Sequence, residues 1–259
     1  MSRIKTAVIL AAGMGSRLSD VTNDQIPKGL LSVNGKTLVE RSIEKLRSIG
    51  IEKIYIVTGH LSSKYDELAN KYKFIKTKKN RKYKATGSMT SLAILENEIK
   101  EDFLLLESDI IYEVYGLIKT VNYEMDDCIL LSGKTNSGDE CYVEVKDNNL
   151  YKISKNIDEI GQVYGELVGI SKISLELYKA MIKEYKNYNF DKEEEYEFID
   201  YNKDSSKKYD YEDAIFDVAK HRKVGYLKIE NLIWGEIDNK EHLERIKSVV
   251  LPKIERVIS

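Results

Sequence analysis

Short apolar runs alternate with amphipathic helical patterns over the first 130 residues, and this alternation constrains the fold more than any other feature. Residues 4–10 (IKTAVIL) are apolar and β-branched and end at Ala-Ala-Gly, as expected of a buried strand. The other expected elements here are helices at 36–50, 62–72 and 88–99 and strands at 53–59 and 102–112. The alternation predicts an α/β fold with a mostly parallel, Rossmann-like central sheet flanked by helices.

After residue 130 the pattern changes. Residues 141–154 alternate and turn at Asp147-Asn148-Asn149, which predicts a β-hairpin. A strand and a helix follow over 166–185, and the acidic stretch 192–200 is expected to form a solvated connection. The remaining expected elements are a helix starting near Tyr211, a last strand pair within 225–237 and a closing helix at 240–254. We expect one domain, 1–259, made of a first part (1–130) and a smaller hairpin-and-helix part with closing elements (131–259).

The bulk composition excludes several classes of protein. The chain has 259 residues, and 41 basic against 43 acidic side chains leave a net charge of −2, so no global field favours nucleic acid or a membrane. The basic stretch 71–84 is therefore expected to be a solvated rim. Cys128 and Cys141 form neither a disulfide framework nor a metal-spaced cluster. The first apolar run is too short for a signal peptide or a membrane span, which predicts a cytoplasmic location and leaves a homodimer open.

Ligands of parallel α/β sheets bind beyond the carboxyl ends of the strands. This rule brings four separate segments to one edge of the predicted sheet. They are the loop 11–17, the turn near Gly59, the segment 84–88 and the strand end 107–109.

The loop LAAGMGSRL (10–18) fits neither of two common nucleotide motifs. Leu18 stands where a dinucleotide fingerprint has its third glycine, and no Gly-Lys-Ser/Thr follows as in a Walker loop. On its own, Gly-x-Gly is equally typical of a structural strand-to-helix turn. The residues around and after this loop favour a phosphate site, because Arg17 and Lys28 place positive charge beside backbone N–H groups that can approach phosphates. Asp109 ends a buried strand at the same edge, where a metal ligand is wanted.

These motifs resemble the nucleotidyltransferases, the family that joins NTPs to phosphorylated small molecules. The resemblance covers about the first 115 residues and includes sugar-phosphate nucleotidyltransferases and cytidylyltransferases. It implies a GT-A-like fold in which 1–130 binds the nucleotide and 131–259 the acceptor. It further implies that Gly13, Gly15 and Arg17 wrap the triphosphate, that Lys28 binds phosphates, and that Asp109 holds Mg²⁺. A second metal aspartate is implied in Gly-Glu-Ile-Asp at Asp238, a residue that is equally suited to cap the last helix.

Cytosine is the base that we expect in this pocket. It fits against small side chains and the backbone, and a Ser hydroxyl or a backbone N–H can satisfy its O2 and N3. Lys155 either reaches a phosphate or lies in solvent. The residues expected to bind CTP, besides the two glycines of the loop, are Leu10, Ala11, Ala12, Gly87, Ser88 and Lys155.

Several stretches, among them TGSMTSL (86–92) and GELVGISKIS (165–174), resemble bacterial cytidylyltransferases that activate 2-aminoethylphosphonate, and phosphocholine enzymes are also similar. A primary ammonium has three N–H donors and favours carboxylates, whereas a quaternary ammonium favours an aromatic cage. Carboxylates dominate the expected acceptor segments, although Tyr142, Tyr164 and Tyr211 offer a cage. The expected acceptor residues are Asp139, Glu140, Tyr142, Glu166, Tyr211, Glu212 and Asp213.

The expected reaction is Mg²⁺-dependent transfer of CMP from CTP to 2-aminoethylphosphonate with release of pyrophosphate. It needs no nucleophile–base pair, which agrees with a sequence of only three histidines. The alternatives are phosphocholine as acceptor, a sugar 1-phosphate behind it, and a module that binds a nucleotide without turnover.

Overall fold

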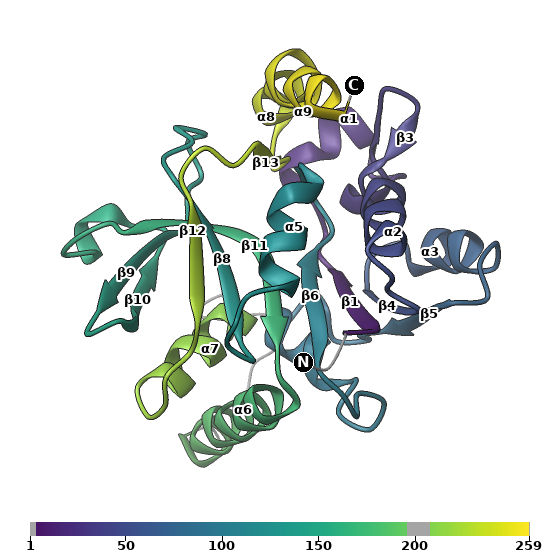
Figure 1. Cartoon of the computed structure of the whole chain (residues 1–259). Helices are drawn as coiled ribbons and strands as arrows, with labels where there is room; N and C mark the ends of the chain where they lie inside the picture. Colours follow the sequence, from purple (N-terminus) through teal and green to yellow (C-terminus); the bar gives the residue numbers. More distant parts are fainter. Residues whose placement is uncertain (1–3, 196–207, 259) are drawn as a thin grey trace.

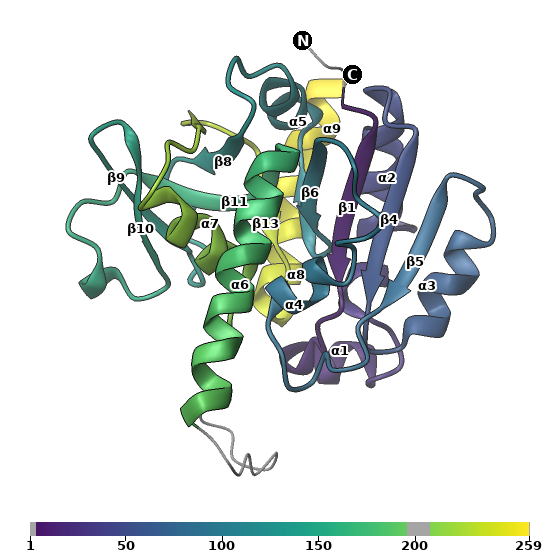
Figure 2. The ribbon, with the colours of Figure 1, turned by 90° about the horizontal axis from the view of Figure 1, so that it is seen from below.

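The computed structural model describes residues 4–195 and 208–258, which form a sheet covered by helices on both faces (Figures 1 and 2). The parallel core runs in the order β6-β1-β4-β5, so the predicted parallel α/β sheet is confirmed for the first half of the chain. Its strands are β1 (Thr6–Ala11), β4 (Lys53–Thr58), β5 (Ile75–Lys79) and β6 (Phe103–Glu107).

The later strands extend the same sheet beyond β6, mainly in antiparallel fashion. β11 (Gly165–Ile173) pairs with β6 and carries two branches, one through β9 to β10 and one through β8 to β12. These strands are β8 (Cys128–Ser132), β9 (Tyr142–Lys146), β10 (Asn149–Ser154) and β12 (Tyr226–Ile229). The described residues thus form one nine-stranded sheet to which both halves of the chain contribute.

The alternation of side chains along β1 and β4 feeds two apolar clusters, because successive residues of a strand point to opposite faces. One cluster is closed by α4 (Ser88–Ala93), α6 (Leu175–Glu195) and α7 (Tyr211–Ala219), and the other by α2 (Leu38–Ser48), α3 (Ser62–Ala69) and α5 (Val114–Val121). A third cluster joins the closing helices α8 (Lys240–Arg245) and α9 (Leu251–Ile258) to Leu18 and Leu31.

The remaining elements are short. α1 covers Ser19–Thr22, and two-residue strands β2 (Ser32–Val33) and β3 (Lys36–Thr37) pair with each other. One-turn 3₁₀ helices lie at Ser16–Leu18, Lys28–Leu30 and Ile157–Glu159, and a π-helical turn at Ile246–Val250 links α8 to α9.

The strand expected at 102–112 is broken in two, which corrects the sequence prediction. β6 ends at Glu107, and β7 (Ile110–Tyr112) leaves the sheet to pair antiparallel with β13 (Trp234–Glu236). Ser108 and Asp109 lie at the break, and the Ser108 N–H donates to the Leu10 carbonyl at 3.2 Å. The break turns the polar end of the strand toward the edge where β1 also ends.

Two other predicted boundaries also shift. The helix expected at 62–72 begins at Ser62 as predicted, after the left-handed Leu61 (φ 49°), but it ends at Ala69. The helix expected at 88–99 already ends at Ala93. By contrast, α2 matches its pattern: Thr37 and Glu40 form a capping box at its start, and Gly50 follows its end with φ 91°.

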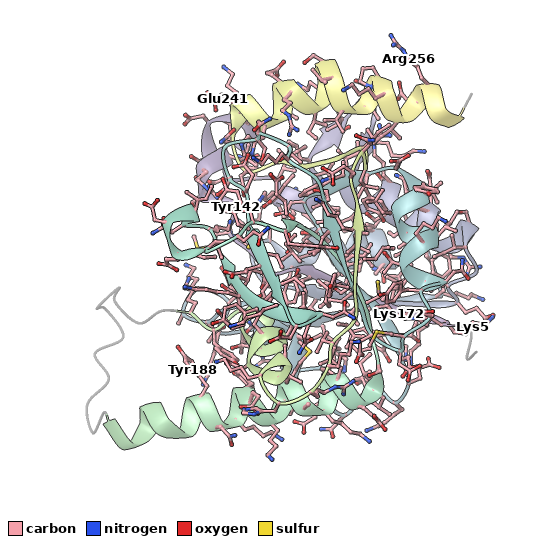
Figure 3. The ribbon with its side chains drawn as sticks, turned by 60° about the vertical axis from the view of Figure 1, so that its left-hand side comes forward. Lys5, Tyr142, Lys172, Tyr188, Glu241 and Arg256 are labelled. Carbon is pink, nitrogen blue, oxygen red and sulfur yellow. The ribbon has the colours of Figure 1, made fainter. Side chains whose placement is uncertain are left out.

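In the second half, the predicted hairpin is confirmed, with left-handed Asp147 and Asn148 in its turn. The expected last strand pair is wrong, since β12 pairs with β8 whereas β13 pairs with β7. The stretch 192–200 is not simply a connection, because α6 runs on to Glu195, and 196–200 lies outside the described residues. Figure 3 shows Tyr188 rising from α6 toward the body, where its ring stacks on Tyr209 at 4.3 Å between centroids.

Among the helices described here, none combines the length and the apolar character needed to cross a bilayer. Both cysteines are free, with Cys128 buried and Cys141 half-buried.

Candidate active site

A cavity of about 510 Å³ opens where β1 and β6 end. Its wall takes in three of the four segments that the sheet rule predicted, namely the loop after β1, the start of α4 and the segment 107–109. The turn near Gly59 does not reach the wall. It supports the wall instead, because Gly59 lies so close to the Ala12 carbonyl and the Tyr83 side chain that a Cβ would overlap both.

The glycine loop is shaped to pass close over Lys28. Gly15 adopts a left-handed conformation, with φ 64°, and a Cβ there would lie 3.3 Å from the Lys28 Cβ. Glycine adopts this conformation without steric cost. The following 3₁₀ turn presents Arg17, whose side chain remains half exposed.

Lys28 sits among carboxylates. Its Nζ atom forms ion pairs with Asp109 and Asp238 and lies 3.6 Å from Glu236. Burial disfavours the charged form, but Asp109 and the neighbouring carboxylates outweigh burial and raise the pKa of Lys28, which stays positive. The cavity therefore holds a fixed ammonium charge at its floor.

Arg17 and Lys155 meet at Asp139. The Arg17 guanidinium donates to Asp139 at 2.9 Å and lies 3.1 Å from Asp238, while the Lys155 Nζ lies 3.5 Å from Asp139. The sequence assigned Asp139 to the acceptor, but in this arrangement it orients two cations of the phosphate side.

Three carboxylates gather beside Lys28. Single oxygens of Glu107, Asp109 and Glu236 all lie within 4.8 Å of one another. Burial, with the negative charge of Asp109 next, raises the pKa of Glu107 to about 7 and also raises the pKa of Glu236. Asp238 adds an Oδ2 atom that is buried and has no hydrogen-bond partner among the described residues.

This donor set fits a divalent cation. Mg²⁺ takes oxygen ligands from one or two carboxylates and completes its shell with waters and phosphates. The sequence proposed Asp109 and Asp238, and the structure places both against Lys28, with Glu107 and Glu236 as further candidates. An orphaned carboxylate oxygen and crowded acids are what a cation would relieve.

The starts of α4 and α7 are bonded to each other through Asp210. The Ser88 N–H and Oγ both donate to Asp210 Oδ1, at 2.7 and 2.9 Å, and the Tyr211 N–H donates to Ser88 Oγ at 2.9 Å. The Ser88 hydroxyl, which the sequence assigned to cytosine, is thus already engaged within the protein. Gly87 is required beside it, since a Cβ would overlap the Tyr209 carbonyl.

Tyr211 and Glu212 follow on the first turn of α7 and both line the cavity. The Tyr211 hydroxyl donates to Glu107 Oε1 at 2.7 Å, so this tyrosine orients a carboxylate. Glu212 has a buried Oε2 atom without a hydrogen-bond partner in the described part of the chain. Burial, with the charge of Glu107 next, raises the pKa of Glu212 well above its ordinary value.

The other predicted acceptor residues do not share one cavity. Asp139, Glu140 and Glu166 line a second cavity of about 20 Å³, and Glu236 borders both cavities. Tyr142 and Asp213 line neither cavity. The Tyr142 hydroxyl donates to Glu140 at 3.3 Å, and Asp213 accepts the Asp210 N–H at 2.9 Å as part of the α7 cap.

The predicted CTP residues Leu10, Ala11, Ala12, Gly13, Gly15, Gly87, Ser88 and Lys155 all line the large cavity. The sequence reading missed Glu107 and Glu236 although each stands two residues before a predicted metal aspartate. In extended chain this spacing puts both side chains on the same side, and that signal could have found them. No sequence pattern points to Asp210, because its role depends on the contact between α4 and α7.

Comparison with known proteins shows what the chain is similar to. Residues 7–126, a little under half of the chain, match the model of the MobA-like NTP transferase domain. Its relatives include cytidylyltransferases. The CTP:phosphoglutamine cytidylyltransferase of Campylobacter jejuni is 27% identical over 201 residues, covering 71% of this chain and 79% of that protein.

Two further matches span more of the chain. The bifunctional IPC transferase and DIPP synthase of Aquifex aeolicus is 22% identical over 96% of this chain, which spans only 52% of that protein's length. The solved CTP:phosphocholine cytidylyltransferase of Streptococcus pneumoniae superposes with a TM-score of 0.76 at 22% identity, over 96% of this chain and 99% of that one. At this identity the superposition establishes the α/β nucleotidyltransferase fold.

Proposed function

We propose that this protein is a Mg²⁺-dependent cytidylyltransferase that transfers CMP from CTP to 2-aminoethylphosphonate and releases pyrophosphate. The observation that carries the proposal is the joint placement of Lys28, Asp109 and Asp238 beneath a glycine loop at the end of a parallel sheet. This arrangement supplies positive charge and metal ligands at one point, which is what phosphoryl chemistry requires.

In the proposed reaction, a phosphonate oxygen forms a bond to the α-phosphorus of CTP as the bond to the pyrophosphate oxygen breaks. The attacking oxygen is already an anion at neutral pH, so no side chain has to remove a proton. The barrier lies in bringing anions together and in stabilising the charge that develops on the phosphates. Arg17 and Lys28 serve this purpose as the catalytic cations.

Asp109 and Asp238 are proposed to hold the Mg²⁺ ion, with Glu236 or Glu107 able to join them. When bound, the ion neutralises phosphate oxygens and orients the leaving group. Asp109 and Asp238 pair with Lys28 in this structure, so Lys28 would lose these partners if both aspartates held the ion. Lys28 would then be available to the triphosphate, as the family resemblance implies.

The nucleotide is proposed to lie along Leu10, Ala11, Ala12, Gly13 and Gly15, with its base toward Gly87 and Ser88 and with Lys155 near its phosphates. Because the Ser88 hydroxyl is bonded to Asp210, backbone groups are the better candidates for reading cytosine O2 and N3. Asp210 itself lines the cavity.

For the acceptor we favour a primary amine over the quaternary amine of phosphocholine. Of the three tyrosines that could build an aromatic cage, only Tyr211 lines the large cavity. Tyr164 packs edge-on against Tyr226 instead, and Tyr142 bonds to Glu140. Phosphocholine stays the second candidate, because a relative of the same fold is named for it.

The test is pyrophosphate release with Mg²⁺ and each of the four NTPs, against 2-aminoethylphosphonate, phosphocholine, phosphoethanolamine and glucose 1-phosphate. The proposal expects release with CTP and 2-aminoethylphosphonate. Release with another acceptor alone contradicts the assigned acceptor and keeps the transferase. If no acceptor gives pyrophosphate release but calorimetry shows CTP binding, the result would instead support a nucleotide-binding module.

A further inference from the structure

We infer that Glu107 and Glu212 form the subsite that binds the ammonium group of the acceptor. The inference rests on the proposed function for the identity of the acceptor, and it assigns the amine to Glu212, which has no CTP or metal role, and to Glu107, which borders the proposed metal ligands.

The charged side chains of the large cavity differ in whether they have an ion-pair partner. Lys28 is paired with Asp109 and Asp238, and Arg17 and Lys155 share Asp139. Within the described ranges, neither Glu107 nor Glu212 forms an ion pair with a lysine, an arginine or a histidine, although both line the cavity. The cavity thus holds two carboxylates that form no direct ion pair among the described residues.

Glu212 provides an independent sign of a missing ligand. Its Oε2 atom is out of contact with solvent and accepts no hydrogen bond from the residues that the structure describes. A buried acceptor without a donor is destabilising until a ligand supplies one.

The pair is held in place by rigid elements. Glu212 lies on the first turn of α7, which Asp210 bonds to Ser88 at the start of α4. Glu107 ends a central strand, accepts the Tyr211 hydroxyl through one oxygen, and packs over Gly169, where a Cβ would come within 2.8 Å of its Cδ.

A primary ammonium matches this pair better than the other cations available. It brings one positive charge and three N–H donors, so it can satisfy the bare Oε2 of Glu212 and the free oxygen of Glu107 together. A trimethylammonium group has no donor and would leave that oxygen unbonded. A divalent metal is better served by the neighbouring group of Glu107, Asp109 and Glu236, to which Glu212 does not belong.

The experiment compares two ligands that differ only in the cationic group, 2-aminoethylphosphonate and n-propylphosphonate. Their binding is measured by calorimetry in the presence of Mg²⁺ and α,β-methylene-CTP, which cannot be cleaved. Wild-type protein should bind the amine about 10- to 100-fold more tightly, as expected when a charged group completes a buried hydrogen bond. Glu212→Gln should reduce this preference to roughly 3-fold or less and leave n-propylphosphonate binding unchanged.

The matched control is Glu241→Gln, which removes the same charge from an exposed position at the start of α8 (Figure 3). It should keep the full preference, and thermal melting should show that both variants are folded. Equal weakening of both ligands in Glu212→Gln would overturn the inference in favour of a structural role. Weaker binding of Mn²⁺ alone in that variant would overturn it in favour of a metal site.

The outcome is separate from that of the proposed function. A wild-type protein that prefers the amine but releases no pyrophosphate contradicts the transferase and keeps the subsite. A wild-type protein that releases pyrophosphate but does not distinguish the two phosphonates overturns the subsite and keeps the transferase.

Discussion

The two sides of the large cavity differ in how their charges are balanced. On the phosphate side, Lys28 is paired with Asp109 and Asp238, and Arg17 with Asp139 and Asp238. On the acceptor side, Glu107 and Glu212 lack such partners among the described residues. In our proposal, the first side carries its own cations, which would exchange partners when a metal and a triphosphate bind. The second side would take its countercharge from the ligand.

The largest expected effect comes from removing a metal ligand on the phosphate side. Asp109→Asn keeps the shape of the side chain but halves the proposed pair of metal aspartates, so kcat should fall at least about 1,000-fold, comparable to the loss of a key charge-stabilising group. The measurement is pyrophosphate release at saturating CTP and Mg²⁺, with Glu241→Gln as the folded control. Turnover within a few-fold of wild type would remove Asp109 from the metal site.

Lys28→Ala should have the next largest effect. It removes the buried ammonium that we assign to the phosphates, and kcat/KM for CTP should fall about 100- to 1,000-fold. The variant should also bind Mg²⁺ or Mn²⁺ more tightly, because Asp109 and Asp238 lose the cation that competes for them. An unchanged rate, or weaker metal binding, would contradict the exchange of partners.

Tyr211→Phe probes the acceptor side more gently. It removes the hydrogen bond to Glu107 and leaves the ring in place, so the KM for the amine acceptor should rise roughly 3- to 10-fold while the KM for CTP stays constant. Steady-state kinetics with each substrate varied in turn separates the two constants. A rise in the KM for CTP alone would assign Tyr211 to the phosphate side and contradict its role on the acceptor side.

The smallest effect on activity is expected from Thr37→Ala, which lies away from the cavity. It breaks the capping box with Glu40 at the start of α2 and should lower the free energy of unfolding by about 1 kcal/mol without changing kcat/KM. Urea denaturation checks the first part, and Thr37→Ser should retain most of the stability. Loss of activity in a stably folded Thr37→Ala variant would show that the site depends on α2 more than its contacts indicate.

The sequence predicted the first half of the fold well because its signals are local. The buried run of β1, the loop ending in Gly15 and the capped helix α2 each follow from a few adjacent residues. The same holds for the phosphate side of the cavity, where the loop, Lys28 and Asp109 come from strand ends that a parallel sheet must bring together.

The second half depends on contacts that a single sequence does not display. The separation of β12 from β13 follows from the break after Glu107, which creates β7 as a partner for β13. The assignment of Ser88 to cytosine did not foresee its bonds to Asp210, 122 positions away. Among the predicted acceptor residues, Asp213 has a capping role that its position at a helix start could have indicated.

The most direct test of the central claim is a competition in one reaction. CTP and Mg²⁺ are mixed with equal concentrations of 2-aminoethylphosphonate, phosphocholine and phosphoethanolamine, and early products are resolved by ³¹P NMR, so that their ratio gives the ratio of kcat/KM values. The account predicts the CMP ester of 2-aminoethylphosphonate as the dominant product. Dominant CDP-choline would contradict it, because a trimethylammonium group cannot donate to the bare oxygen of Glu212.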